Sequence, residues 1–573
     1  MNSLVSRISS AIGAILLALV PAARAQFGPT TAFVLTGTNV SATAGATTTT
    51  LGGVTFVNQG LVGVGRIDAV AIDAFGESLG SVSGLQVTNW SVNGGGNYSG
   101  SFAFTPDRGY NAGGQFSNYA ARIQQVDFTF TPNSSTATSG IAQNQFSFTY
   151  NAAASTKFTY DSGGGTFVAT TGLVPDSSST LAGATVPFVT LSNGGATNTT
   201  LGGTVINRVT LDTEGLALRA DGSGYASDEY GANIYHFNSA KQIDAVITPP
   251  AAVLPHVAGG ALNFSSEVSN VDGRRGNQGM EGVALSPDGT QLFGLMQSAT
   301  IQDSGSGNQG RLDTRLFVYD VNAAGTTSTL SAEYVIRLPT LNDTGTGTPN
   351  KAAAQSEIIA LDATHLLVLS REGNGKGTTT GLVPDFKSVL LMDLAAATNI
   401  VGLFDGTAGD ITPGSGTALA PGITPITYAE AVNLLNTAQL GKFGLNLNSG
   451  LTADLNSLSE KWEGMALAPT GNPNEYFLFV ANDNDFISGS TVMRGLNGNL
   501  NSPINALTAN GVPVQNDTMF LAYRVTLDGI APIASLSAIP EPSTWAALSG
   551  GAVLLVALMR RFGGRGRTQR RLA

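Results

Sequence analysis

The chain contains no cysteine and very little histidine. Its 573 residues include three histidines, His236, His256 and His365. Without cysteine there is no disulfide and no thiolate ligand for zinc or an iron–sulfur cluster. The histidines lie far apart and no two have metal-ligand spacing, so we interpret all three as structural. The sequence predicts no haem, nucleotide, zinc or iron–sulfur cofactor, and a bound metal would be a hard, oxygen-bound cation such as Ca²⁺.

Charge is also scarce, and acidic residues exceed basic ones. Only 12% of the residues are charged, the net charge is −11 at pH 7, and 72 residues are glycine. An acidic surface argues against nucleic acid as a partner, because phosphate contacts require basic side chains. Abundant glycine and the absence of a sustained 3.6-residue period predict an all-β protein with short strands and many turns.

The N-terminus has the pattern of a secretory signal. Arg7 precedes an apolar stretch from Ala11 to Val20, and Ala23-Arg-Ala25 is a small-x-small cleavage site. We therefore predict a signal peptide over residues 1–25, export by the Sec machinery and a mature chain from Gln26. The following residues, 26–60, are expected to form a leading strand and linker.

The C-terminus reads as a second processing signal over residues 540–573. Pro540-Glu-Pro is followed by an apolar stretch from Trp545 to Met559 and by six arginines. This order resembles the PEP-CTERM sorting signal of Gram-negative bacteria. The resemblance implies a transmembrane helix over 545–559, transient anchoring in the inner membrane, and recognition by an exosortase. It further implies delivery to the cell surface, outer membrane or extracellular matrix; the alternative is a plain tail anchor.

Four segments between these ends start a strand-like apolar run with a glutamate. Glycine follows the glutamate in three of them and Ile358 in the other. Each run leads through a turn to a second apolar run and then to a polar or charged cluster. The glutamates are Glu214, Glu281, Glu357 and Glu463. A repeated strand–turn–strand unit with a fixed polar position is typical of a β-propeller, in which corresponding strands of different blades face one channel.

The repeats predict a β-propeller domain over residues 61–530 with roughly six or seven blades. Successive glutamates are 67, 76 and 106 residues apart, whereas blades of the WD type repeat at roughly 40–50 residues. Some intervals are therefore expected to hold one blade enlarged by loop insertions, and the last interval is expected to hold a long insertion.

These repeats resemble the family described as esterase-like activity of phytase. The resemblance rests on Thr213-Glu-Gly-Leu-Ala-Leu, Glu281-Gly-Val-Ala-Leu-Ser-Pro-Asp-Gly and Trp462-Glu-Gly-Met-Ala-Leu. It covers the chain from about Leu61 to Asp528, and it implies a phytase-like propeller that hydrolyses esters or phosphoesters. The chain departs from the pattern at Ser83-Gly84, where the first repeat has no carboxylate.

We expect the repeated carboxylates to converge at one mouth of the channel. The candidate catalytic residues are Glu214, Glu281, Glu357, Glu463, Arg371 and Glu372. The candidate substrate-binding residues are Asp107, Arg108 and Arg371, since a guanidinium group binds a phosphate through two parallel hydrogen bonds. The candidate metal ligands are Asp228, Glu229, Asp483 and Asp485, because crowded carboxylates either hold protons or bind a cation such as Ca²⁺.

Two functions fit this pattern. The first is a cell-surface hydrolase that cleaves a small phosphate or carbon ester with its channel carboxylates, to which Ca²⁺ could bind. A lactonase-like enzyme that uses the same carboxylates on a carbon ester is a variant of this hypothesis. The alternative is a non-catalytic surface or extracellular-matrix protein that binds polysaccharide on a propeller scaffold. In that case the glutamates would bond backbone amides of the neighbouring blade, and side chains would plug the channel.

Overall fold

The computed structural model describes most of the chain between residues 34 and 533. The described ranges are 34–35, 38–109, 117–191, 205–341, 351–377, 383–486, 492–495, 498–501 and 515–533, without positions 267, 306, 308, 309, 408, 415, 416 and 449–452. The predicted signal peptide and sorting tail lie outside these ranges. Within them, no helix is long and apolar enough to cross a membrane.

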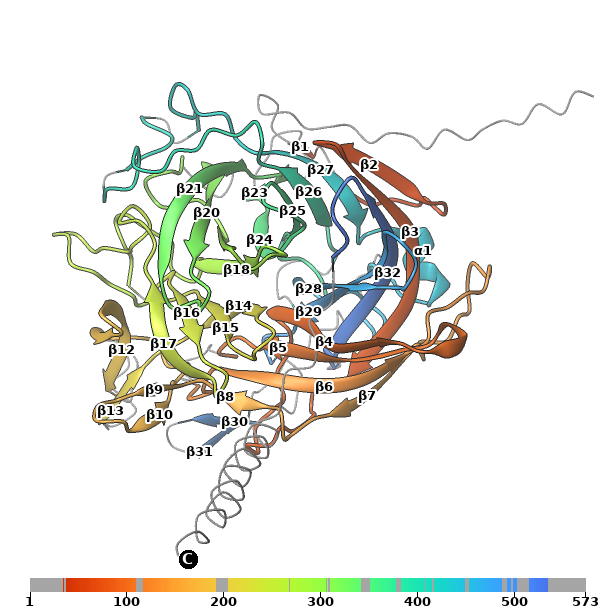
Figure 1. Cartoon of the computed structure of the whole chain (residues 1–573), viewed down its shortest axis with the longest axis horizontal. Coiled ribbons are helices and arrows are strands. Elements are labelled where there is room, and N and C mark those ends of the chain that lie inside the picture. The colour runs from red at the N-terminus through yellow and green to blue at the C-terminus, as the bar shows by residue number, and fades with distance from the viewer. Residues whose placement is uncertain are drawn as a thin grey trace, which may run out of the picture.

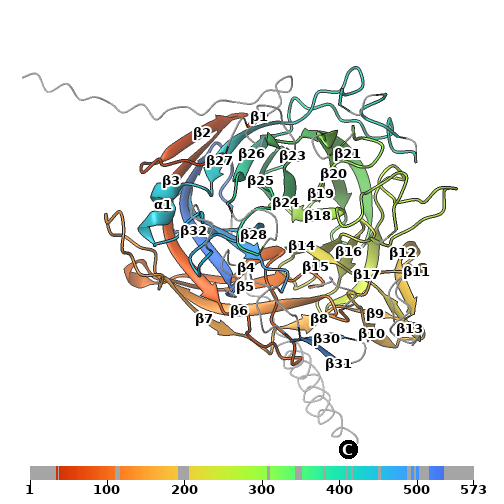
Figure 2. The ribbon, with the colours of Figure 1, turned by 180° about the vertical axis from the view of Figure 1, so that it is seen from behind.

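Five sheets are arranged like blades around a central axis (Figures 1 and 2). Blade one contains β4 (Gly84–Val92), β5 (Tyr98–Thr105), β6 (Arg122–Phe130) and β7 (Phe146–Tyr150). Blade two contains β14 (Thr213–Leu218), β15 (Gly224–Asp228), β16 (Ile234–Phe237) and β17 (Gln242–Ile247). Blade three contains β18 (Met280–Leu285), β19 (Gln291–Met296), β20 (Asp313–Val321) and β21 (Ser328–Arg337). Blade four contains β24 (Ala354–Ala360), β25 (His365–Arg371), β26 (Lys387–Asp393) and β27 (Thr427–Asn433).

The fifth blade is built from both ends of the described chain. Its strands, from the inside outward, are β28 (Lys461–Pro469), β29 (Glu475–Asp483), β32 (Thr518–Asp528), β3 (Val54–Ile67) and β2 (Thr47–Leu51). β32 and β3 are antiparallel, with Leu61 opposite Tyr523. The ring is thus closed by hydrogen bonds between distant segments. The leading segment, expected to be a strand and linker as far as residue 60, supplies β2 and half of β3 to this blade.

The remaining described elements lie outside the blades' main strands. Residues that follow blade one extend neighbouring sheets through β8 (Thr156–Lys157), β9 (Thr159–Asp161) and β10 (Phe167–Ala169). Three strands form a separate sheet: β11 (Ser177–Leu181), β12 (Ala184–Leu191) and β13 (Val205–Val209). Short pieces are β1 (Val34–Leu35), β22 (Thr340–Leu341), β23 (Lys351–Ala352), β30 (Val492–Gly495), β31 (Gly498–Asn501), the 3₁₀ turn at Gly94–Gly96 and the helix α1 (Thr437–Lys442).

The all-β prediction is confirmed, but the blade count differs from the expected six or seven. The described residues form five radial sheets, and their innermost strands contact one another in the order β4, β14, β18, β24, β28 and back to β4. The extra length lies in insertions rather than in further blades. In the sequence, the strands β9 to β13 lie between blade one and blade two, and a long loop joins β26 to β27.

Glycine permits the close approach of the innermost strands. A Cβ atom on Gly215 would lie 2.6 Å from both the carbonyl oxygen of Glu281 and the amide nitrogen of Val283 in the next blade. A Cβ on Gly84 would lie 2.5 Å from the amide nitrogen of Leu216. Glycine is therefore required by blade-to-blade packing at Gly84 and Gly215, since no real Cβ tolerates such distances. The requirement is weaker in blades three and four: a Cβ on Gly282 would lie 3.1 Å from its nearest neighbour, and Ile358 follows Glu357.

Candidate functional site

The site lies at the end of the channel where each first strand begins and each second strand ends. Glu214, Glu281 and Glu463 lie near the starts of β14, β18 and β28. The ladder between first and second strands shifts register at each of these glutamates, which is the signature of a β-bulge. A bulge re-aims a side chain away from the regular alternation of a strand. The same register shift occurs at Glu357 in β24, so the bulge is common to all four repeat glutamates, and three of them face one cavity.

A cavity of about 390 Å³ occupies this end of the channel. Its lining combines seven carboxyl groups with two arginines and one lysine. The lining residues are Asp107, Arg108, Gly109, Asp212, Glu214, Glu229, Asn277, Glu281, Gln297, Arg371, Lys461, Glu463 and Asp485. The structure thus brings Arg108 and Arg371 together with three of the four repeat glutamates, as the hydrolase hypothesis requires.

Each basic side chain of the cavity is paired with an acid. The Arg371 guanidinium forms an ion pair with Glu463 of the next blade, and it also donates a hydrogen bond to the Ser356 hydroxyl at 3.2 Å. Arg108 Nε lies 3.1 Å from Asp212 Oδ2. A substrate oxyanion can therefore contact these arginines only through guanidinium nitrogens that the acids do not occupy. Because the carboxyl groups outnumber the basic side chains, the cavity is acidic.

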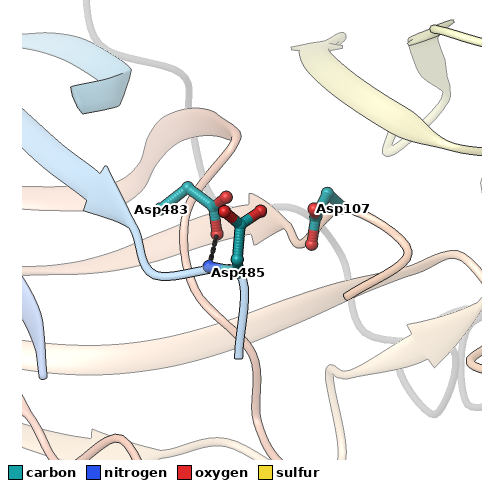
Figure 3. A group of neighbouring side chains, drawn as sticks. All are labelled: Asp107, Asp483 and Asp485. Carbon is teal, nitrogen blue, oxygen red and sulfur yellow. Dashed lines mark hydrogen bonds between the residues drawn. The ribbon is translucent and has the colours of Figure 1, made fainter. Parts of the chain in front are cut away.

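The acids gather in two groups. In the first, carboxylate oxygens of Asp107, Asp483 and Asp485 lie within 4.8 Å of one another (Figure 3). The Asp485 amide donates a hydrogen bond to Asp483 Oδ1 at 3.1 Å, and Asp107 faces this pair from the loop after β5. Lys461 Nζ lies 2.6 Å from Asp485 Oδ1 and 3.6 Å from Asp483 Oδ2.

The second group consists of Asp212, Glu214 and Glu229, whose oxygens also lie within 4.8 Å of one another. All three are buried, and they come from the start of β14 and the loop after β15. Arg108 binds Asp212 from the side, with its amide donating to Asp212 Oδ1 at 3.1 Å. Either group has the hard oxygen donors that a cation of the Ca²⁺ type prefers.

Burial and mutual repulsion shift the pKa values of these acids upward. Burial, followed by the charges of neighbouring acids, raises the pKa of Glu214 and of Glu281 well above the ordinary value. Burial and the neighbouring Asp212 raise the pKa of Glu229 to about 8. Asp485 is the exception: burial alone would raise its pKa, but the charge of Lys461 and the hydrogen bond from it hold the pKa below the ordinary value.

Glu357, the third repeat glutamate, does not line the cavity. Its carboxylate accepts hydrogen bonds from the amides of Leu85 in β4, at 3.3 Å, and of Ile358, at 3.0 Å. Since β4 and β24 belong to non-neighbouring blades, the bond to Leu85 crosses the channel. For this residue the structural interpretation holds, and its side chain helps to close the channel.

Three further predicted residues have structural partners rather than positions on the cavity wall. Asp228 accepts hydrogen bonds from the backbone amides of Asp212, at 2.9 Å, and Gly231, at 2.7 Å. Glu372 pairs with the buried Lys387 at 3.2 Å. Asp483 lies behind Asp485 and accepts a hydrogen bond from the Ser81 hydroxyl. Of the predicted metal ligands, Glu229 and Asp485 are those that line the cavity.

The sequence interpretation missed Asp212 and Lys461. Both precede a repeat glutamate by two residues, as Asp212-Thr-Glu214 and Lys461-Trp-Glu463. That shared spacing was a usable signal, because two charged residues at the same place in two repeats occupy the same place in two blades. Gln297 was also missed: it follows β19 directly, and its amide donates a hydrogen bond to Glu281.

Comparison with known sequences agrees with this geometry. Residues 78–486 match the profile of the Phytase-like family, described as esterase-like activity of phytase. The chain belongs to this family. The matched region of the phytase-like protein runs from just before β4 to just after β29, so it includes every residue of the cavity lining.

The phytase-like protein also resembles individual proteins. It is 31% identical over 477 residues to an "Uncharacterized secreted protein" of Arthroderma benhamiae, with 77% of this chain and 89% of that protein covered. A luciferin-regenerating enzyme covers 83% of the chain at 10% identity with a TM-score of 0.28. The WD40 domain of Toxoplasma gondii coronin covers 87% at 6% identity with a TM-score of 0.24. The matches include 98% of the luciferin-regenerating enzyme and 90% of the coronin domain. Because both TM-scores are low, the fold assignment rests on the sheets described above.

Proposed function

We propose that the phytase-like protein is an exported hydrolase that cleaves an ester or phosphoester in the acidic cavity. One observation carries the proposal: Glu281 lines the same cavity as Arg108 and Arg371, in a chain of a family described by esterase-like activity. A buried carboxyl group with a raised pKa can protonate a leaving group, and its carboxylate form can activate water. Guanidinium groups stabilise the negative charge that develops on ester oxygens.

Glu281 is the preferred acid–base residue among the repeat glutamates. Gln297 fixes its carboxyl group by a hydrogen bond, and burial raises the pKa of Glu281 well above the ordinary value for a glutamate. Glu463 is engaged with Arg371, and Glu357 is engaged with backbone amides. A cation of the Ca²⁺ type, when bound among the carboxylates, would supply positive charge for a phosphate or carbonyl oxygen.

Export and surface display complete the proposal. The signal-like residues 1–25 and the secreted relative support export. β32 runs antiparallel to β29, away from the end of the channel that holds the acidic cavity, and Pro532 and Ile533 line a second cavity at the opposite end. A C-terminal sorting segment processed by an exosortase would therefore leave the acidic cavity facing away from the surface to which the chain is delivered.

A panel of three substrates tests the reaction class. The purified full-length chain is assayed for phosphate release from phytate and p-nitrophenyl phosphate, and for cleavage of p-nitrophenyl acetate, with Ca²⁺ and with a chelator. Turnover of either phosphate substrate assigns a phosphohydrolase, and turnover of the acetate alone assigns a carboxylic-ester hydrolase. A folded chain that turns over none of them contradicts the proposal and favours the polysaccharide- or protein-binding scaffold.

A further inference from the structure

The two acid groups of the cavity differ in how completely their members are partnered. Glu214 is 7% exposed, lines the cavity and makes no hydrogen bond or ion pair with any residue that the structure describes. A carboxyl group so deeply buried is costly unless it gains a partner. Its neighbours Asp212 and Glu229 are other acids, so the group is neutralised either by protons or by a bound cation.

The first group, by contrast, already contains its cation. The Lys461 ammonium lies 2.6 Å from Asp485 and 3.6 Å from Asp483. Asp483 also accepts hydrogen bonds from Ser81 and from the Asp485 amide, and Asp107 accepts one from the Gly109 amide at 2.8 Å. An ammonium ion is a compact charge with three donors, and that of Lys461 lies beside two of the three carboxylates, where it supplies positive charge to this group.

Arg108 does not play the same part in the second group. Its guanidinium contacts Asp212 through Nε, while its other nitrogens point to the Tyr230 hydroxyl and the Asn277 carbonyl oxygen. The planar fork therefore lies along the edge of the group and leaves Glu214 unpaired. When all three carboxylates have released their protons, they carry three negative charges against one positive charge of Arg108, and one divalent cation balances the remainder.

We propose that Asp212, Glu214 and Glu229 bind one divalent cation of the Ca²⁺ type, and that Lys461 serves as the built-in cation of the Asp107–Asp483–Asp485 group. This inference deepens the proposed hydrolase function, since it locates the cation that the reaction would use. It also replaces the expected ligand set, in which Asp228, Asp483 and Asp485 accompanied Glu229. The open side of the site faces the cavity, where a substrate oxygen could complete the coordination.

Calorimetric titration of the full-length chain with Ca²⁺ alone tests the assignment without any turnover. The protein is first stripped with chelator, and roughly 0.15 M salt suppresses weak binding by surface acids. The wild type is expected to bind one Ca²⁺, Glu214→Gln to weaken binding at least about tenfold, and Glu357→Gln, a repeat glutamate outside the cavity, to bind like the wild type. Wild-type stoichiometry of zero, or unchanged binding by Glu214→Gln, overturns the proposal.

Lys461→Met provides a gain-of-site test. Removing the ammonium leaves Asp107, Asp483 and Asp485 without a cation, so the stoichiometry is expected to rise from one to two, while Lys461→Arg keeps it at one. A folded Lys461→Met variant that still binds one ion contradicts the role given to Lys461. If that variant does not fold, Asp485→Asn discriminates instead: one ion remains if the second group is the site, and none remains if the first group is. Cation binding without hydrolysis would leave this inference intact and refute only the proposed reaction.

Discussion

The Arg371 guanidinium and the Glu463 carboxylate form an ion pair that joins blades four and five inside the cavity. Arg371 ends β25, Glu463 lies near the start of β28, and both side chains are less than a tenth exposed. Each charge is tolerated in this position because the other is present. The ion pair therefore holds blades four and five together and also balances charge within the acidic cavity.

Removal of one partner should destabilise the protein more than removal of both. Arg371→Met leaves the Glu463 charge buried without compensation, which costs about 3–5 kcal/mol. The double variant Arg371→Met/Glu463→Gln should recover most of that loss. Chemical denaturation of the wild type, both single variants and the double variant measures the coupling, and additive losses would show that the two side chains act independently.

The glycines after the repeat glutamates give a second stability prediction. Gly215→Ala places a methyl group against the backbone of Glu281 and Val283 and should cost about 1–3 kcal/mol. Gly441→Ala in α1 is the matched control, since a Cβ there meets no atom within 4 Å. Thermal denaturation should show a loss for the first variant and no loss for the second. An equally stable Gly215→Ala protein would mean that the blades are not in tight contact there.

The raised pKa values predict that the cation-free protein loses stability as the pH rises. Glu229 keeps its proton in the folded state up to about pH 8, whereas its ordinary pKa is 4.5. A group whose pKa is raised by folding stabilises the protein at low pH, and that contribution is lost between the two pKa values. The melting temperature in chelator should therefore fall from about pH 5 to about pH 8, and the fall should be shallower in Glu229→Gln.

The exposed Asp288 supplies the control for this pH profile. It lies in a turn at the other end of the channel, and hydrogen bonds from Ser286 and Thr290 lower its pKa. Asp288→Asn should leave the slope of melting temperature against pH unchanged between about pH 5 and about pH 8. A rise in the wild-type melting temperature over that window would contradict the buried, protonated state of the cavity acids.

The sequence was sufficient to predict the convergence of Glu214, Glu281 and Glu463, because a fixed place in each repeat becomes a fixed place in each blade. It could not predict the blade count, since blade five joins β3 and β32 from segments more than 400 residues apart. Nor could it separate Glu357 from the other glutamates. That distinction depends on a hydrogen bond to Leu85 across the channel, which only the closed ring creates.

The ion pairs and hydrogen bonds within the cavity could not be predicted from the sequence either. Arg108 and Arg371 were expected to be available to a phosphate, but each is bound to an acid from another strand. Asp228 looked like a metal ligand because it lies in the polar cluster that follows the second apolar run of its repeat. Its carboxylate instead caps backbone amides, since the chain turns sharply after β15. Such roles are decided by the direction of a side chain, which repeat spacing does not determine.

The most direct test of the central claim compares two glutamates of the same repeat position. Glu281→Gln alters the proposed acid–base group inside the cavity, and Glu357→Gln alters its counterpart outside it. On whichever ester the wild type hydrolyses, kcat of Glu281→Gln should fall at least about 100-fold, while Glu357→Gln should keep a rate within a few-fold of the wild type. Equal rates for the two folded variants would show that the cavity is not where the reaction takes place.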